Sequence, residues 1–320
     1  MRKFLYIIVL ILMLVYSCIE NDKVKEDVEV IQIDLSIERF DQQFMSSTRQ
    51  TLDGVKEKYP FLFPKRFSDS LWIAKIQDSL QLDLSNEINN VFNDFDQIES
   101  EIAFLFKHLK YYNSNFKTPR VITVFSDWDY RSKNQVTDSI ILISLDTYLG
   151  KNHRFYDGVQ KYLVQNFESN QIVPDLAFKY AEQKIPGFRR KTLLEEMIYY
   201  GKIYYFMDVM IPFKMDEEKI GYSKGQLDWA ITNEVNIWTY FVENELLFNT
   251  DPKLTFRFIN PAPFSKFNLE LDRESPGRIA RYMGWQIVRA YMKNNDVDLT
   301  DMLNTDATTI FNKAKFKPRK

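Results

Sequence analysis

The sequence predicts an α+β fold that is mostly α-helical and contains one small β-sheet. Apolar residues recur at helical spacing from Leu84 to Leu109, and similar patterns return through most of the second half of the chain. Runs of β-branched residues occur chiefly at 119–126 and 139–145. No repeat of fixed period and no cluster of Pro and Gly divides the chain. We therefore expect residues 30–320 to form a single globular domain.

The first 17 residues are organised like a secretory signal. Arg2 and Lys3 precede an apolar run at 4–16, which is shorter than the about 20 residues that span a bilayer. Cys18 is the single cysteine, and the residues before it match a bacterial lipobox. This pattern predicts that residues 1–17 are removed and that Cys18 is acylated; the alternative is a signal anchor with an incidental cysteine. Acylation of Cys18 would leave no thiol for a disulfide or for cysteine catalysis.

The elements that follow Cys18 are predicted in order from their patterns. Residues 18–29 are polar and charged, and we expect them to form a tether. Residues 30–37 alternate apolar and polar side chains, which predicts a half-buried strand. Helices are expected from about residue 38 to residue 110. The two β-branched runs are joined by a polar loop and predict either a hairpin or neighbouring strands, and helices resume after Gly150.

Composition argues against several classes of function. The chain has 42 basic and 44 acidic side chains; loss of Arg2 and Lys3 with the signal leaves 40 and 44, a formal charge of −4. This balance provides no basic face for nucleic acid. The histidines, His108 and His153, lie in no HExxH pattern, and the nine glycines form no phosphate-binding loop. We expect a protein that is not an enzyme and that holds no metal or cofactor.

One polar group stands out in an apolar segment, TLLEEMIYYGKIYYFMDVMIP, at 192–212. On a helix, Glu195, Tyr199 and Lys202 share one face, because they are spaced by about one turn each. Thr192 and Glu195 also form a capping-box pattern, which gives Glu195 a structural role. The favoured interpretation is a core salt bridge or a Lys side chain that extends to solvent. A ligand site and, less favoured, a catalytic dyad are the alternatives.

The segment DWAITNEVNIWTYFVENELLF, at 228–248, is rich in aromatic residues. Trp229, Trp238 and Tyr240 have spacings that suit an amphipathic helix with a buried face. The same rings could form a surface that stacks on sugars. The buried helix is the favoured interpretation, and Trp238 is kept as a candidate binding residue.

The segment SPGRIARYMGWQIVRAYM, at 275–292, predicts a further helix. Ser275 is the expected N-cap and Pro276 the first helical residue. Gly284 in the middle of a helix costs about 1 kcal/mol relative to Ala, so we expect it to mark close helix packing. Arg278 is a candidate anion-binding residue, although exposure to water is the favoured interpretation for it and its neighbouring arginines.

Several segments together resemble the gliding-motility lipoprotein GldB family. They are the lipobox, IERFD at 37–41, MIYYGKIYYFMDVMIP at 197–212, NEVNIWTYFVENELLFNTD at 233–251, SPGRIARYMGWQIVRAYM at 275–292 and KFKP at 315–318. The resemblance covers nearly the whole chain in the right order. It implies a protein of the envelope of gliding bacteria that supports movement over surfaces and is associated with export of surface adhesins.

A fainter resemblance concerns architecture. The order of strand pair, helix and second helix is similar to zincin-like peptidases, whose first helix carries HExxH. Here Asp175 and Lys179 stand at the histidine positions, and Tyr200 stands where those peptidases place a Glu before Gly201. The resemblance implies a degenerate zincin-like fold whose metal ligands are lost.

These inferences combine into one expected function. The chain is expected to be an envelope lipoprotein needed for gliding motility, held to a membrane by its N-terminal lipid with its body exposed to the periplasm. It would act as a non-catalytic binding or scaffolding component, with other motility or secretion proteins of the envelope as partners. The alternatives are a glycan-binding lipoprotein and a carboxylate-based hydrolase that acts on a cell-surface polymer.

Overall fold

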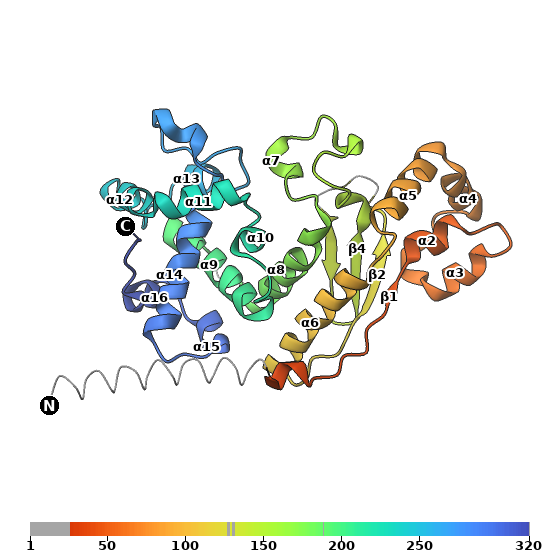
Figure 1. The fold of residues 1–320 in the computed structure, drawn as a ribbon, viewed down its shortest axis with the longest axis horizontal. Helices are drawn as coiled ribbons and strands as arrows, with labels where there is room; N and C mark the ends of the chain where they lie inside the picture. The colour runs from red at the N-terminus through yellow and green to blue at the C-terminus, as the bar shows by residue number, and fades with distance from the viewer. Residues whose placement is uncertain (1–25, 127–128, 130–131, 188, 320) are drawn as a thin grey trace.

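The computed structural model describes residues 26–126, 129, 132–187 and 189–319. The predicted signal peptide (1–17), Cys18 and residues 18–25 of the predicted tether lie outside the described residues. Figure 1 shows the sheet with α2–α6 at one end of the molecule and α11–α16 at the other. The strands are β1 (Ile37–Glu38), β2 (Arg120–Val124), β3 (Asn134–Val136) and β4 (Ile140–Ser144).

Helices make up most of the described chain, which confirms the predicted fold class. In the first half they are α2 (Phe40–Met45), α3 (Leu52–Lys58), α4 (Asp69–Gln77), α5 (Ser79–Val91), α6 (Asp96–Tyr112) and α7 (Lys161–Val164). In the second half they are α8 (Ile172–Lys184), α9 (Leu193–Met210), α10 (Asp216–Ile220), α11 (Lys224–Thr232), α12 (Glu234–Glu243), α13 (Lys253–Phe258), α14 (Ile279–Asn294), α15 (Leu299–Asn304) and α16 (Ala307–Ala314).

The sheet has the strand order β1-β2-β4-β3, and its two longest strands are parallel neighbours. Of the two arrangements that the sequence left open for the β-branched runs, neighbouring strands are correct and a hairpin between them is wrong. The reason is β3, which pairs antiparallel with β4 at the outer edge. The chain leaves β2, forms this edge strand, and returns antiparallel to it as β4, so β4 must run in the same direction as β2.

The N-terminal segment is more ordered and less strand-like than predicted. The tether expected over 18–29 ends early, because residues 26–29 form a helical turn and Val28 is fully buried. Residues 31–36 alternate partly buried and exposed side chains as a strand would. Within the predicted strand at 30–37, however, only Ile37 is in strand conformation; the ladder runs Ile37–Glu38, paired with Val121 and Ile122 of β2.

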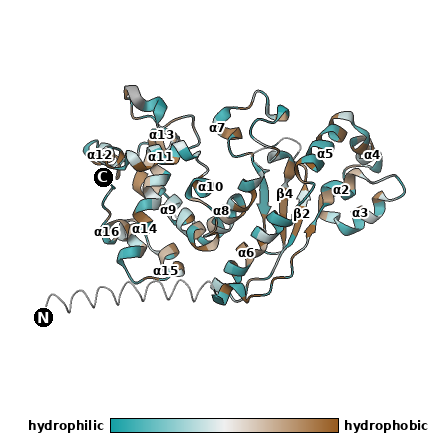
Figure 2. Ribbon diagram, in the orientation of Figure 1, coloured by the Kyte–Doolittle hydropathy of each residue, from teal (hydrophilic) through white to brown (hydrophobic). Residues whose placement is uncertain are grey.

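The two faces of the sheet support two apolar clusters. Val121, Ile141 and Ile143 pack into the larger cluster, which continues through α5, α6, α8, α9 and α14. Ile122 and Val124 point the other way, into a smaller cluster with the aromatic side chains of α2 and its neighbours. This division follows from the two-residue period of a strand. Figure 2 shows the resulting concentration of apolar residues on β2 and β4.

Helices α9 and α14 cross at two glycines in the centre of the second half. A Cβ added at Gly284 would lie 1.8 Å from the Met197 carbonyl oxygen, and one added at Gly201 would lie 2.3 Å from the Gly284 carbonyl oxygen. The close helix packing expected from Gly284 is therefore present. Because α9 has buried apolar residues around most of its circumference, it is suited to this central position.

Helix α14 begins three residues later than predicted. Its first residue is Ile279 and its N-cap is Arg278, so the prediction of Ser275 as N-cap and Pro276 as first residue is wrong. The Ser275 hydroxyl is occupied elsewhere: it accepts from the Ser265 amide at 3.1 Å and donates to a carbonyl of its own loop. These bonds hold the SPGR segment as a loop.

Candidate binding groove

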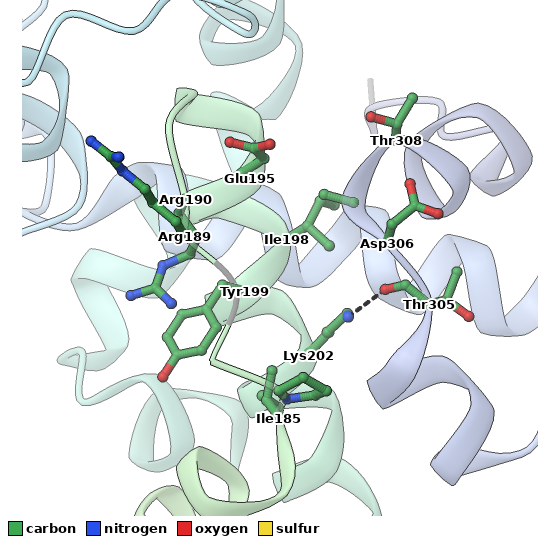
Figure 3. Close-up of a pocket in the computed structure, with 12 residues that line it drawn as sticks. Ile185, Arg189, Arg190, Glu195, Ile198, Tyr199, Lys202, Thr305, Asp306 and Thr308 are labelled. Atoms are coloured by element: carbon green, nitrogen blue, oxygen red, sulfur yellow. Dashed lines mark hydrogen bonds between the residues drawn. The ribbon is translucent and has the colours of Figure 1, made fainter.

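The N-terminal half of α9 forms one wall of an open cavity of about 160 Å³. The other walls are formed by the start of α16 and by Ile185, Pro186, Arg189 and Arg190, which precede α9 (Figure 3). Glu195, Tyr199 and Lys202 all line this cavity, so the structure brings the three predicted site residues together. A second depression meets the cavity at Arg189 and Arg190 and continues toward residues 249–252 and the start of α13. We call the two together the α9 groove.

Glu195 is held in place by the start of its own helix. Its Oε2 accepts from the amides of Lys191 at 2.6 Å and Thr192 at 2.8 Å, and the Thr192 hydroxyl accepts from the Glu195 amide. The predicted capping box is therefore confirmed. The Lys191 and Thr192 amides lower the pKa of Glu195. Its carboxylate is thus stabilised in the ionised form and is a poor proton donor at neutral pH.

Lys202 does not pair with Glu195 within the part of the chain that the structure describes. Its Nζ donates to the carbonyl oxygens of Leu303, at 2.9 Å, and Thr305. The side chain is 5% exposed, and burial lowers its pKa to about 8 although Asp306 nearby opposes the shift. Lys202 therefore joins α9 to the junction between α15 and α16, at the floor of the groove.

Two arginines that the sequence analysis did not select form the rim of the groove. The Arg190 guanidinium lies 3.8 Å from the centre of the Tyr199 ring, and its Nε is 3.0 Å from Glu196. Arg189 is exposed and makes no ion pair with any residue that the structure describes. The signal that could have located them is the basic run RRK, at 189–191, directly before the capping box.

Asp306 faces Glu195 from the other side of the cavity, at the start of α16 (Figure 3). The side chain and amide of Thr309 lower the pKa of Asp306. The Glu195 and Asp306 carboxyl groups, which line the cavity, are therefore both held ionised. Among the described residues, no group of three or more metal-ligating side chains gathers. In the same residues, no helix is long and apolar enough to cross a membrane.

Arg278 lies outside the groove and has a structural role. It adopts a left-handed backbone conformation with φ of 62°, and its guanidinium donates to the Gly221 carbonyl at 2.8 Å. The same group lies 5.5 Å from the centre of the Tyr222 ring. The favoured expectation that Arg278 faces water is thus wrong, because its charged end is used within the fold.

The aromatic candidates do not form one platform. Trp238 packs against Phe311 and, at 5.2 Å between ring centres, Phe316 of the C-terminal tail. Trp229 and Tyr240 line a different depression. The Tyr240 hydroxyl is used internally, since it donates to the Phe267 carbonyl at 2.7 Å.

The comparison with protein families identifies the chain. Residues 21–318 match the family described as gliding motility protein GldB. This chain belongs to the GldB family. No curated protein and no solved structure matches it. Membership in this family agrees with the resemblance to GldB lipoproteins that the sequence segments indicated. Nothing in these comparisons supports the resemblance to zincin-like peptidases.

In this GldB family member, the positions compared with zincin ligands carry internal contacts. Asp175 pairs with Lys133 and accepts from the Tyr148 hydroxyl at 2.8 Å. Lys179 pairs with Glu182 on its own helix, at 2.9 Å. The Tyr200 ring is covered by the guanidinium of Arg281. These side chains stabilise packing.

Proposed function

We propose that this GldB family member is a lipid-anchored envelope protein that supports gliding motility as a non-catalytic binding or scaffolding component. The family gives the motility lipoprotein class. Acylation at Cys18, exposure of the body to the periplasm and a link to adhesin secretion are the finer parts of the proposal. The feature of the body that best supports a binding role is the α9 groove.

The charge of the groove indicates what it binds. Basic residues are concentrated on its rim, where Arg189 and Lys191 are exposed. The acidic residues of the groove are engaged or lie in the cavity: Glu195 accepts from backbone amides, Glu196 pairs with Arg190, and Asp306 caps α16. The cavity of about 160 Å³ continues at Arg189 and Arg190 into the second depression of about 460 Å³, so the groove is elongated and open, a shape that suits an extended segment. We infer that the groove receives an extended segment of a partner protein that places an acidic side chain against Arg189 on the rim, away from the ionised carboxylates of the cavity.

Charge reversal at the rim tests this role. A photo-crosslinker is placed in the groove of the native, lipidated protein. The yield of crosslinked partner and the gliding speed are then compared between cells that carry Arg189→Glu and cells that carry Arg49→Glu. Both arginines are exposed without a described ion pair, and Arg49 lies between α2 and α3, away from the groove. We expect Arg189→Glu to remove the crosslinked partner and slow gliding at unchanged protein level, and Arg49→Glu to do neither. Normal gliding with an intact crosslink in the Arg189→Glu strain would refute the groove as the partner site.

The anchor has an independent test. Mass spectrometry of the mature N-terminus should find acyl chains on Cys18, and Cys18→Ala should release the protein from the membrane fraction, because two acyl chains give stable attachment. Retention of that variant in the membrane would remove the anchor from the proposal.

The hydrolase alternative receives little support from the groove. A glycosidase needs one carboxyl group kept protonated as a general acid. Glu195 and Asp306 both have lowered pKa values, so neither suits that role. Glycan binding keeps one supporting observation, the open depression lined by Trp229, Asn233 and Asn236. Titration of the purified protein with envelope polysaccharide, read by tryptophan fluorescence, would detect it.

A further inference from the structure

We propose that the face around the C-terminal end of α6 lies against the lipid bilayer. This inference rests on the proposed acylation of Cys18 and adds to it an orientation for the body. The described chain enters the fold at this face, since residues 26–29 pack beside α6. The face carries exposed tyrosines of the kind that favour the membrane interface.

The short connection to the lipid limits how the body can turn. Seven residues, 19–25, lie between the acylated position and the start of the described chain, and the eight Cα–Cα steps that join them reach at most about 29 Å at full extension. A body of this length has a radius of gyration of about 19 Å, which for a sphere corresponds to a diameter of about 50 Å. The tether is therefore too short to bring the far side of the body to the bilayer.

The entry point is fixed firmly to α6. Val28 is fully buried. The Lys107 amine donates to the Glu29 carbonyl at 2.9 Å, and the Lys110 amine donates to the Gln32 carbonyl at 3.3 Å. The tether therefore starts at a defined place on the body.

Tyrosines surround this place. Tyr111 and Tyr112 end α6 with 36% and 42% of their surface exposed, and their ring centres are 5.0 Å apart. Burial, together with the nearby Tyr111 and Tyr205, raises the pKa of Tyr112, which places a third tyrosine, from α9, close by. Val30 adds an apolar side chain that is 73% exposed. Tyrosine rings settle at the headgroup level because one end is apolar and the other forms hydrogen bonds.

Charge does not explain the contact. Lys107, Lys110 and Lys117 on this face are balanced by the acidic side chains of the helical turn at 26–29, where Glu26, Asp27 and Glu29 lie. Attraction to anionic lipid would need an excess of basic residues. We therefore expect a contact made by the tyrosine rings that is nearly independent of salt concentration.

The test uses the acylated full-length protein in nanodiscs of phosphatidylethanolamine and phosphatidylglycerol. A fluorophore is attached at Ser114→Cys, beside the tyrosines, or at Asp228→Cys on α11; both positions are exposed, and an acylated Cys18 does not react with the label. Brominated lipids should quench the label at position 114 at least twofold more than the label at position 228. The ratio of quenching at position 114 to quenching at position 228 should be unchanged in 500 mM salt.

Matched substitutions separate docking from anchoring. The double variant Tyr111→Ser with Tyr112→Ser should lose the difference in quenching while remaining on the nanodisc. Leu80→Ser, which removes a 53% exposed apolar side chain from α5, should keep it. Equal quenching at both positions in an acylated protein would overturn the docking face and leave the anchor intact. Absence of acyl chains on Cys18 by mass spectrometry would overturn both.

Discussion

Gly284 of α14 rests directly on the backbone of Met197 of α9, with a Cβ position only 1.8 Å from the Met197 carbonyl oxygen. Gly201 of α9 returns the contact, since its own Cβ position falls 2.3 Å from the Gly284 carbonyl oxygen. Atoms cannot approach so closely, and the obstacle on each side is main chain that cannot rotate away. The two glycines therefore set the distance between the two central helices.

Gly284→Ala should destabilise the protein strongly. The added methyl group forces α9 and α14 apart and disturbs the side chains packed around the crossing, so we expect a loss of about 3 kcal/mol or more in the free energy of unfolding. Urea denaturation followed by circular dichroism measures the loss. Gly225→Ala on α11 is the control, because its Cβ position meets nothing within 4 Å. It should be neutral or stabilise by about 0.5 kcal/mol.

Lys202→Met should change the pH dependence of stability. Burial lowers the pKa of Lys202 to about 8 in the folded protein, from 10.5. Between these pH values the unfolded chain keeps a proton that the folded chain releases, so the stability of the wild type rises with pH. The variant lacks this rise, which amounts to at most about 3 kcal/mol. Denaturation curves from pH 7 to 11 measure it, and exposed Lys293→Met on α14 should behave like the wild type.

Asp208→Asn should weaken the attachment of α10 to α9 and α14. The Asp208 carboxylate accepts from Arg289 and Trp285 of α14 and from Lys219 of α10, at 2.7 to 2.9 Å. The substitution leaves the charges of Arg289 and Lys219 poorly compensated. We expect a loss of about 2–4 kcal/mol in the free energy of unfolding, measured by thermal or urea denaturation. Exposed Asp228→Asn is the control and should cost little. Equal stability of both variants would show that the network contributes nothing.

Truncation after Ala314 should destabilise the C-terminal half. The tail covers Glu234, which is 1% exposed: the Arg319 amide donates to it at 2.9 Å, and Phe316 packs on Trp238. We expect a loss of about 2–3 kcal/mol in the free energy of unfolding. Arg319→Ala keeps the main-chain donor and should cost less than half as much. If the two variants were equally unstable, the side chain rather than the main chain would be the important contact.

The features that the sequence could predict are local. Thr192 and Glu195 stand three residues apart and cap α9 as expected, and Gly284 marks a close approach because a glycine inside a helix needs a reason. The α+β class also follows from local periodicity. Each of these depends on residues within a few turns of one another.

The missed features depend on partners distant in sequence. Lys202 is bonded to carbonyls about one hundred residues later, which no helical spacing can reveal. The parallel pairing of β2 with β4 is decided by β3, which has only three residues and no alternating pattern of its own. The predicted start of α14 was wrong because Ser275 has the chemistry of an N-cap but its hydroxyl bonds to another loop.

The crossing of α9 and α14 can form only after both helices have been synthesised. Gly201 and Gly284 are 83 positions apart (284 − 201), so a ribosome that adds about 5–20 residues per second makes the second glycine about 4–17 s after the first. During that interval α9 can pack only on earlier helices such as α6 and α8, and the surface that α14 covers has no partner. The packing of the second half around α9 is therefore completed only after α14 has been made, late in the synthesis of the chain.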